Sequence, residues 1–189
     1  MFTEAESILP TGVMESLAER VRGQIVKYPS LAEVKCGASL AHQGLLSSVE
    51  ILWLDNVNLA SVPDQHLDSL ISCVTGTVVI QNISGCDLVT ALNSGKSRAL
   101  DIKYQRLGWD EIQALVRALE TRVKDLHLEG VTLNIMALTK YSGQGRCRLV
   151  SCVNSDIVKH RKKLKTWAER KHWEFCEASG PICYMKRPS

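Results

Sequence analysis

The sequence VEILWLDNVNL, at residues 49–59, contains a pattern that the rest of the chain repeats. Its aliphatic residues are Val49, Leu52, Leu54, Val57 and Leu59. The same spacing returns in VKDLHLEGVTL, at residues 123–133. Two copies in one register, with helix-like sequence between them, predict an array of stacked units that each contain one short strand.

Weaker matches to the same spacing begin at residues 31, 75, 97 and 147, the first of them formed by Leu31, Val34 and Cys36. The units then start 18 to 26 residues apart, which is typical of short structural repeats. Helical spacing lies between the expected strands, in two sets of residues: Leu67, Leu70, Ile71 and Val74, and Ile112, Leu115, Val116 and Leu119. Strands that alternate with helices predict an α/β fold with a parallel sheet.

Both ends of the array are expected to be closed by helices, since a stacked array must cover its outermost layers. Apolar residues four positions apart, from Val13 to Ile25, predict an N-terminal helix, and a long C-terminal helix is expected from Ser155 to about Glu177. The predicted organisation is an N-terminal helical cap over residues 1–30, the array over 31–154, a capping helix over 155–178 and a tail over 179–189.

At residues 49–59 and 123–133 the chain resembles leucine-rich repeat proteins, and its helical segments make it similar to the ribonuclease-inhibitor type. That type also forms the C-terminal arrays of nucleotide-binding leucine-rich-repeat receptors, and F-box substrate adaptors are near relatives. The resemblance implies a solenoid with short parallel strands on a concave face, helices on the convex face and helical caps at both ends. At the strand-exit turn, where the family usually has Asn or Cys, this chain has other residues: Val57, Ile83, Gln105, Val131 and Ser155. The buried Asn ladder of the family is therefore not expected.

Proteins of this family bind other proteins on the concave face, and the resemblance implies the same here. In a strand, alternate side chains point to opposite faces, so residues beside the inward leucines should face outward. The expected protein-binding patch consists of Trp53, Asp55, Asp101, Lys103, Tyr104, His127 and Glu129. An exposed Trp beside charged groups is typical of a binding hot spot. The alternative is that the charged residues only pair with one another across the sheet, and that the N-terminal segment covers Trp53.

A second candidate site lies near the C-terminus, where seven basic residues accompany one acid, Glu169. The basic residues are Lys159, Arg161, Lys162, Lys163, Lys165, Arg170 and Lys171. Basic residues on a helix can neutralise phosphates, and the interleaved Trp167 and Trp173 could stack on bases. The alternative is a solvated outer face of a capping helix whose tryptophans belong to the core.

The sequence shows no catalytic motif. Gly95-Lys96-Ser97 resembles the end of a phosphate-binding loop, but position 90, where that loop needs Gly, is Thr. No C-x-x-C pair or G-x-S-x-G sequence occurs, and the five histidines are scattered over different elements. We therefore expect no enzyme activity, no metal site and no cofactor.

The cysteines and the distribution of apolar residues indicate the cellular compartment of the protein. Seven cysteines are an odd number, and four of them, Cys36, Cys73, Cys147 and Cys152, occupy positions for small buried side chains, as reduced thiols do. No signal peptide and no membrane-spanning segment is apparent. We expect a cytoplasmic or nuclear protein without disulfides.

The sequence favours a non-catalytic protein–protein interaction module. By family analogy alone it would act in innate immune sensing or signalling. The alternatives are a nucleic-acid binder that uses the basic C-terminal helix, and a substrate adaptor of the F-box-like type.

Overall fold

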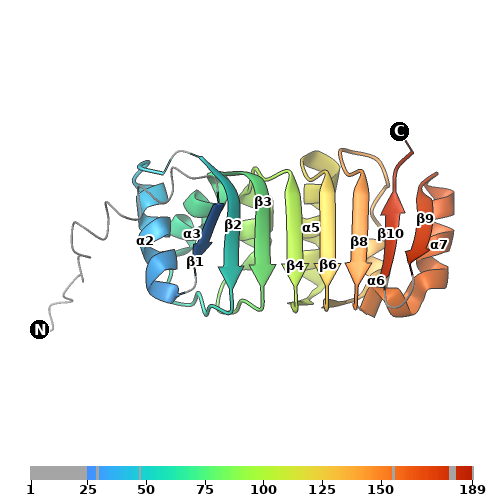
Figure 1. The fold of residues 1–189 in the computed structure, drawn as a ribbon, viewed down its shortest axis with the longest axis horizontal. Coiled ribbons are helices and arrows are strands. Elements are labelled where there is room, and N and C mark those ends of the chain that lie inside the picture. Colours follow the sequence, from blue (N-terminus) through green and yellow to red (C-terminus); the bar gives the residue numbers. More distant parts are fainter. Residues whose placement is uncertain (1–24, 29, 47, 155, 179–181, 189) are drawn as a thin grey trace, which may run out of the picture.

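The computed structural model describes residues 25–28, 30–46, 48–154, 156–178 and 182–188. Its main feature is one eight-stranded sheet in which the first six strands in spatial order run parallel and the last two are antiparallel to their neighbours (Figure 1). The mixed α/β class expected from the sequence is therefore confirmed. In spatial order the strands are β1 (Ile25–Tyr28), β2 (Val49–Asp55), β3 (Val74–Gln81), β4 (Ala99–Lys103), β6 (Asp125–Glu129), β8 (Leu149–Val153), β10 (Ile182–Lys186) and β9 (Glu174–Ala178).

The helices lie between the strands in the sequence, and in the view of Figure 1 the first and the last helix stand at the two ends of the sheet while the others lie behind it. The helices are α2 (Leu31–His42), α3 (Asp64–Ser72), α4 (Leu88–Ser94), α5 (Trp109–Thr121), α6 (Ile135–Leu138), the 3-10 helix η1 (Asp156–His160) and α7 (Arg161–Arg170). A separate two-stranded sheet joins β5 (Arg106–Leu107) to β7 (Thr132–Leu133). In the part of the chain described, no helix is long and apolar enough to cross a membrane.

The core lies between the sheet and the helices, and it is built from aliphatic layers. Each of the five strands from β2 to β8 contributes two inward side chains that are at most 3% exposed: Leu52 and Leu54, Val78 and Ile80, Leu100 and Ile102, Leu126 and Leu128, and Val150 and Cys152. The helix α5 closes these layers with the expected Ile112, Leu115, Val116 and Leu119, all buried. Helix α3 buries Leu67, Leu70 and Ile71 as expected, whereas Val74 already begins β3.

Each strand from β2 to β8 leaves the sheet through a residue in the left-handed backbone conformation. These residues have φ between 44° and 59° and are Asn56, Asn82, Tyr104, Gly130 and Asn154. The backbone N–H of each of the first four donates to the carbonyl of the last residue of the next strand. The side chains of Asn82 and Asn56 are joined by a hydrogen bond of 2.7 Å. This is a single contact between two exposed side chains, one residue before the position where the family has its buried Asn.

The N-terminal part of the described chain differs from the sequence prediction. Leu31, Val34 and Cys36 were expected in a strand, but they lie in α2, which begins after Ser30 caps the backbone N–H of Glu33. The spacing of these three residues fits a helix as well as the repeat pattern. Ile25, expected in the capping helix, begins β1, which pairs with β2. The rest of that predicted helix lies outside the described residues.

The C-terminal part also differs, because the expected capping helix over 155–178 is interrupted. Helix α7 ends at Arg170, and His172 adopts a left-handed φ of 58° that reverses the chain. Trp173 then packs edge-on against Trp167, with ring centroids 5.6 Å apart. The following residues form β9, and residues 182–186 of the expected tail form β10, which inserts between β8 and β9.

The amide side chain of Gln105 supports one of the strand-exit turns, and its removal should destabilise the fold. Its Oε1 accepts from the backbone N–H of Ile83 at 3.1 Å, and its Nε2 donates to the carbonyl of the same residue at 2.8 Å. We predict that Gln105→Ala lowers the free energy of unfolding by about 1–3 kcal/mol, because a partly buried donor and acceptor lose their partner. Urea denaturation measures this change.

The matched control is Gln65→Ala, at an exposed position of α3, which should change the free energy of unfolding by no more than about 0.5 kcal/mol. Equal stability of Gln105→Ala and the wild type would contradict the structural role of this amide.

Candidate functional site

The outward side chains of the parallel strands form continuous rows across the open face of the sheet. The strand register aligns Trp53 with Val79, Asp101, His127 and Ser151 in one row. A second row, one step nearer the strand exits, contains Asp55, Gln81, Lys103, Glu129 and Val153. This is the arrangement that the alternation along the strands predicts.

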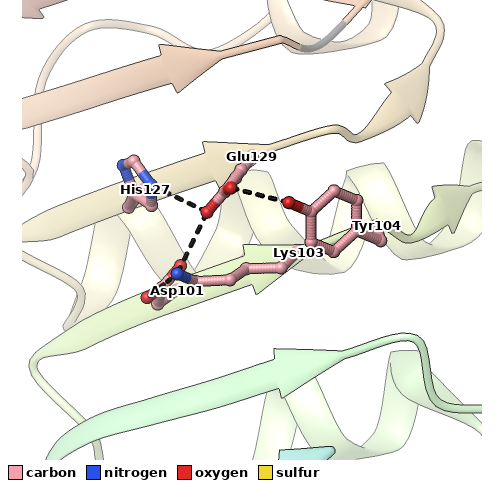
Figure 2. A network of polar contacts seen from close by, with 5 residues as sticks. All are labelled: Asp101, Lys103, Tyr104, His127 and Glu129. Atoms are coloured by element: carbon pink, nitrogen blue, oxygen red, sulfur yellow. Dashed lines mark hydrogen bonds and ion pairs between the residues drawn. The ribbon is translucent and has the colours of Figure 1, made fainter. Parts of the chain in front are cut away.

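Five of the predicted site residues form one polar network on β4 and β6 (Figure 2). The ammonium group of Lys103 lies 3.0 Å from Oε2 of Glu129 and 3.5 Å from Oδ2 of Asp101. The imidazole Nε2 of His127 lies 4.0 Å from Oε2 of Glu129. The hydroxyl of Tyr104 donates to Oε1 of Glu129 at 2.8 Å. The side chains of Asp101, Lys103 and Glu129 are 22–25% exposed, so this network is accessible but partly shielded from water.

Tyr104 reaches this network because of two backbone features. Its own φ of 50° turns the chain at the end of β4. Its ring then lies over Gly130, where a Cβ atom would come within 2.6 Å of Tyr104 Cδ1. Only Gly therefore fits beneath the ring, and Gly130 also has a positive φ of 59°. The Tyr104 side chain remains 55% exposed.

The two carboxyl groups of the network have pKa values that move in opposite directions. Burial raises the pKa of Asp101, and the nearby charges of Lys103 and His127 offset this only in part. The pKa of Glu129 is lowered, first by the hydrogen bond from Tyr104 and then by that from Lys103. Asp101 Oδ1 is buried and has no hydrogen-bond donor within the described chain. Asp101 is thus the member of the network whose negative charge is least well compensated.

Trp53 and Asp55 share the rows of the network but are separated from it by β3. Val79 and Gln81 stand between them and β4. Both side chains are half-buried, and Asp55 accepts a hydrogen bond of 2.6 Å from its neighbour Asn56. The structure therefore brings together five of the seven predicted patch residues and leaves these two on its flank.

The tryptophans of the basic C-terminal region are not exposed, as base stacking would require. Trp167 and Trp173 are buried, and their indole N–H groups donate to the carbonyls of Tyr141 and Gly143. Lys159 is paired with Asp156 at 2.7 Å, and Arg161 is half-buried. The remaining predicted residues are exposed: Lys162, Lys163, Lys165, Arg170 and Lys171.

Two sets of surface residues lie near these sites but were not predicted from the sequence. Tyr184, 37% exposed, joins the row of His127 and Ser151 through β10, and the alternation in ICYMK at 182–186 was the available signal. Basic residues also stand directly before successive strands, at Arg98, Lys124 and Arg148. Among the described residues, no group of three or more His, Cys, Asp or Glu could hold a metal ion.

The raised pKa of Asp101 predicts how its replacement changes stability with pH. A carboxyl group with a raised pKa binds its proton more readily in the folded than in the unfolded state, so acidification through that pKa stabilises the folded protein. We predict that the free energy of unfolding of the wild type increases relative to that of Asp101→Asn as the pH falls from neutral to mildly acidic. Urea denaturation at a series of pH values measures this difference.

Asp110→Asn makes the same chemical change at an exposed site on α5 and serves as the control. A relative gain for Asp101→Asn on acidification would show that Asp101 does not have a raised pKa.

Comparisons with protein families, with curated proteins and with solved structures give no match to this chain.

Proposed function

We propose that the chain forms a leucine-rich repeat solenoid of the ribonuclease-inhibitor type and acts as a non-catalytic module that binds another protein on its concave, strand-lined face. The repetition of one strand and one helical segment per unit supports the architecture. The partly exposed network of Asp101, Lys103, Tyr104, His127 and Glu129, on the face opposite the helices, is the observation that carries the function. By analogy of fold alone, the module would serve innate immune sensing or signalling.

The charge of the network favours a basic group on the partner. Apart from His127, the single positive charge of Lys103 faces the two negative charges of Asp101 and Glu129. The alternative that these residues only pair across the sheet explains the contacts of Lys103, but it leaves Asp101 with a raised pKa and an unpaired oxygen. A Lys or Arg side chain of the partner, placed beside Asp101, would compensate this charge.

The flanks of the network supply the apolar contacts that a protein interface needs. Trp53 lies on one side, Tyr184 lies on the other, and the exposed ring of Tyr104 stands at the strand exits. Aromatic anchors around partly desolvated charges are typical of interface hot spots. The seven free cysteines support a location in the cytoplasm, where thiols stay reduced.

The concave face is tested by the double substitution Trp53→Ala with Asp101→Arg. We predict that this variant loses partners that the wild type captures from cell lysate, as measured by quantitative mass spectrometry. For a purified partner, we expect an affinity reduced by roughly 30-fold or more, because truncation at a hot spot costs about 2 kcal/mol.

The matched control is Trp109→Ala with Asp110→Arg, which makes the same two changes at exposed positions at the start of α5, on the helical side. Circular dichroism establishes that both variants are folded. Capture of the same proteins by the wild type and both variants would exclude the concave face as the binding site.

A further inference from the structure

The edge of the sheet where the parallel strands begin carries a row of basic residues. Arg98, Lys124 and Arg148 directly precede β4, β6 and β8, and Arg187 directly follows the antiparallel β10. Backbone hydrogen bonds connect them in order: Lys124 N–H to Arg98 O at 2.6 Å, Arg148 N–H to Lys124 O at 2.6 Å, and Arg187 N–H to Arg148 O at 2.9 Å. These four residues, the basic row, therefore stand on neighbouring strands about 4.8 Å apart.

The basic row borders a cleft in which positive charge is concentrated. The cleft has a volume of about 760 Å³, and its lining includes Lys124, Arg146, Arg148, Lys186 and Arg187. None of these five cations forms an ion pair with a residue that the structure describes. The two nearby acids form no ion pair with these cations either. They are Asp125, which follows Lys124 in the sequence, and Glu174, which lies opposite Lys186 in the strand register. The charge of the cleft is thus available to an anionic ligand.

One member of the row also holds the cleft in shape. The guanidinium group of Arg187 donates to the carbonyls of Gly145 at 2.8 Å and Gly143 at 2.7 Å. It lies 5.3 Å from the centre of the Trp173 ring. Arg187 therefore fixes the loop that carries Arg146, while Arg98, Arg146 and Arg148 remain exposed.

The basic row continues onto helix α7. Gly143 lies against the side chain of Lys171, whose Cβ would be 2.8 Å from a Cβ added at Gly143. Lys162, Lys163 and Arg170 of the helix, with Lys171 directly after it, border a second hollow of about 660 Å³. Positive charge thus extends from the strand starts over the end of α7 and along that helix.

We propose that the basic row, extended by the cations of α7, binds the phosphate backbone of a nucleic acid without recognising its bases. Three steps between strands make the row roughly 14 Å long, and a nucleic-acid strand carries one phosphate per about 3.4 Å. Roughly four phosphates can therefore lie along the row. The cleft has no aromatic lining residue, and the nearby Trp167 and Trp173 are buried, so base stacking is absent. A single small phosphate compound would occupy only part of this surface.

The test measures fluorescence anisotropy of labelled single-stranded RNA and of duplex DNA with the whole chain. We expect binding of at least one of them at low salt, weakened roughly 50- to 150-fold between 50 and 200 mM salt if about four phosphates are neutralised. The two probes distinguish RNA from DNA as the source of the phosphates. No binding of either at low salt would overturn the proposal.

The variant Arg98→Glu, Lys124→Glu, Arg148→Glu leaves the structural Arg187 intact and should reduce affinity at least tenfold. The neutral variant Arg98→Gln, Lys124→Gln, Arg148→Gln should bind with a shallower salt dependence than the wild type. It replaces the Glu variant as the test if the Glu variant does not fold. The matched control is Lys35→Glu, Arg106→Glu, Arg117→Glu, which changes the net charge equally at exposed positions elsewhere. An equal loss in this control would overturn the assignment to the row. Competition by polyglutamate as effective as that by unlabelled nucleic acid would also overturn it, in favour of an acidic protein partner.

Discussion

The identical register of the parallel strands is the constraint on which the rest of the structure depends. From β2 to β8, each strand must bury two side chains beneath the sheet, and the helices that cover them lie on one side only. A slip of one residue in any strand would move its two buried side chains to the open face and its two outward side chains into the core. Burial of Leu126 and Leu128 therefore determines the outward position of His127 and Glu129. The packing of the core thus determines which side chains lie on the open face and in what order.

The strand exits show how a local backbone requirement becomes a surface feature. A turn into the left-handed conformation follows each strand, and Asn or Gly meets this requirement at four of five positions. The fifth is Tyr104, for which the conformation is less favourable. Its ring lies over Gly130 of the next turn, and its hydroxyl donates to Glu129. The strained turn is therefore compensated by a contact that belongs to the candidate binding face.

Much of this arrangement could be predicted, because burial with a period of two residues leaves a direct record in the sequence. The positions of Asp101, Lys103, His127 and Glu129 followed from the leucines and isoleucine beside them. The helix α2 could not be predicted, because Leu31, Val34 and Cys36 fit both a repeat strand and one side of a helix. The strand β1 was not predicted because its first residue, Ile25, continues the helical spacing that starts at Val13. Strand β10 was missed because its five residues follow a Ser-Gly-Pro break, and it pairs with β8, which is distant in sequence. The fit of Tyr104 over Gly130 depends on two φ values that no spacing of residues encodes.

The polar network on the open face and the basic row at the strand starts lie about three residues apart along β4 and β6, and we expect their two proposed ligands to bind independently. From Arg98 to Asp101 the extended chain covers about 10 Å, which is more than the Debye length of about 8 Å at physiological salt. The negative charge around Asp101 is therefore largely screened from the basic row. Strands β4, β6 and β8 each follow a basic residue, and stacking places these three residues in one row at the edge of the sheet and the outward side chains in other rows on its face. Because the same register aligns the two surfaces, a change in the core would disturb both, whereas a surface substitution on one should leave the other unchanged.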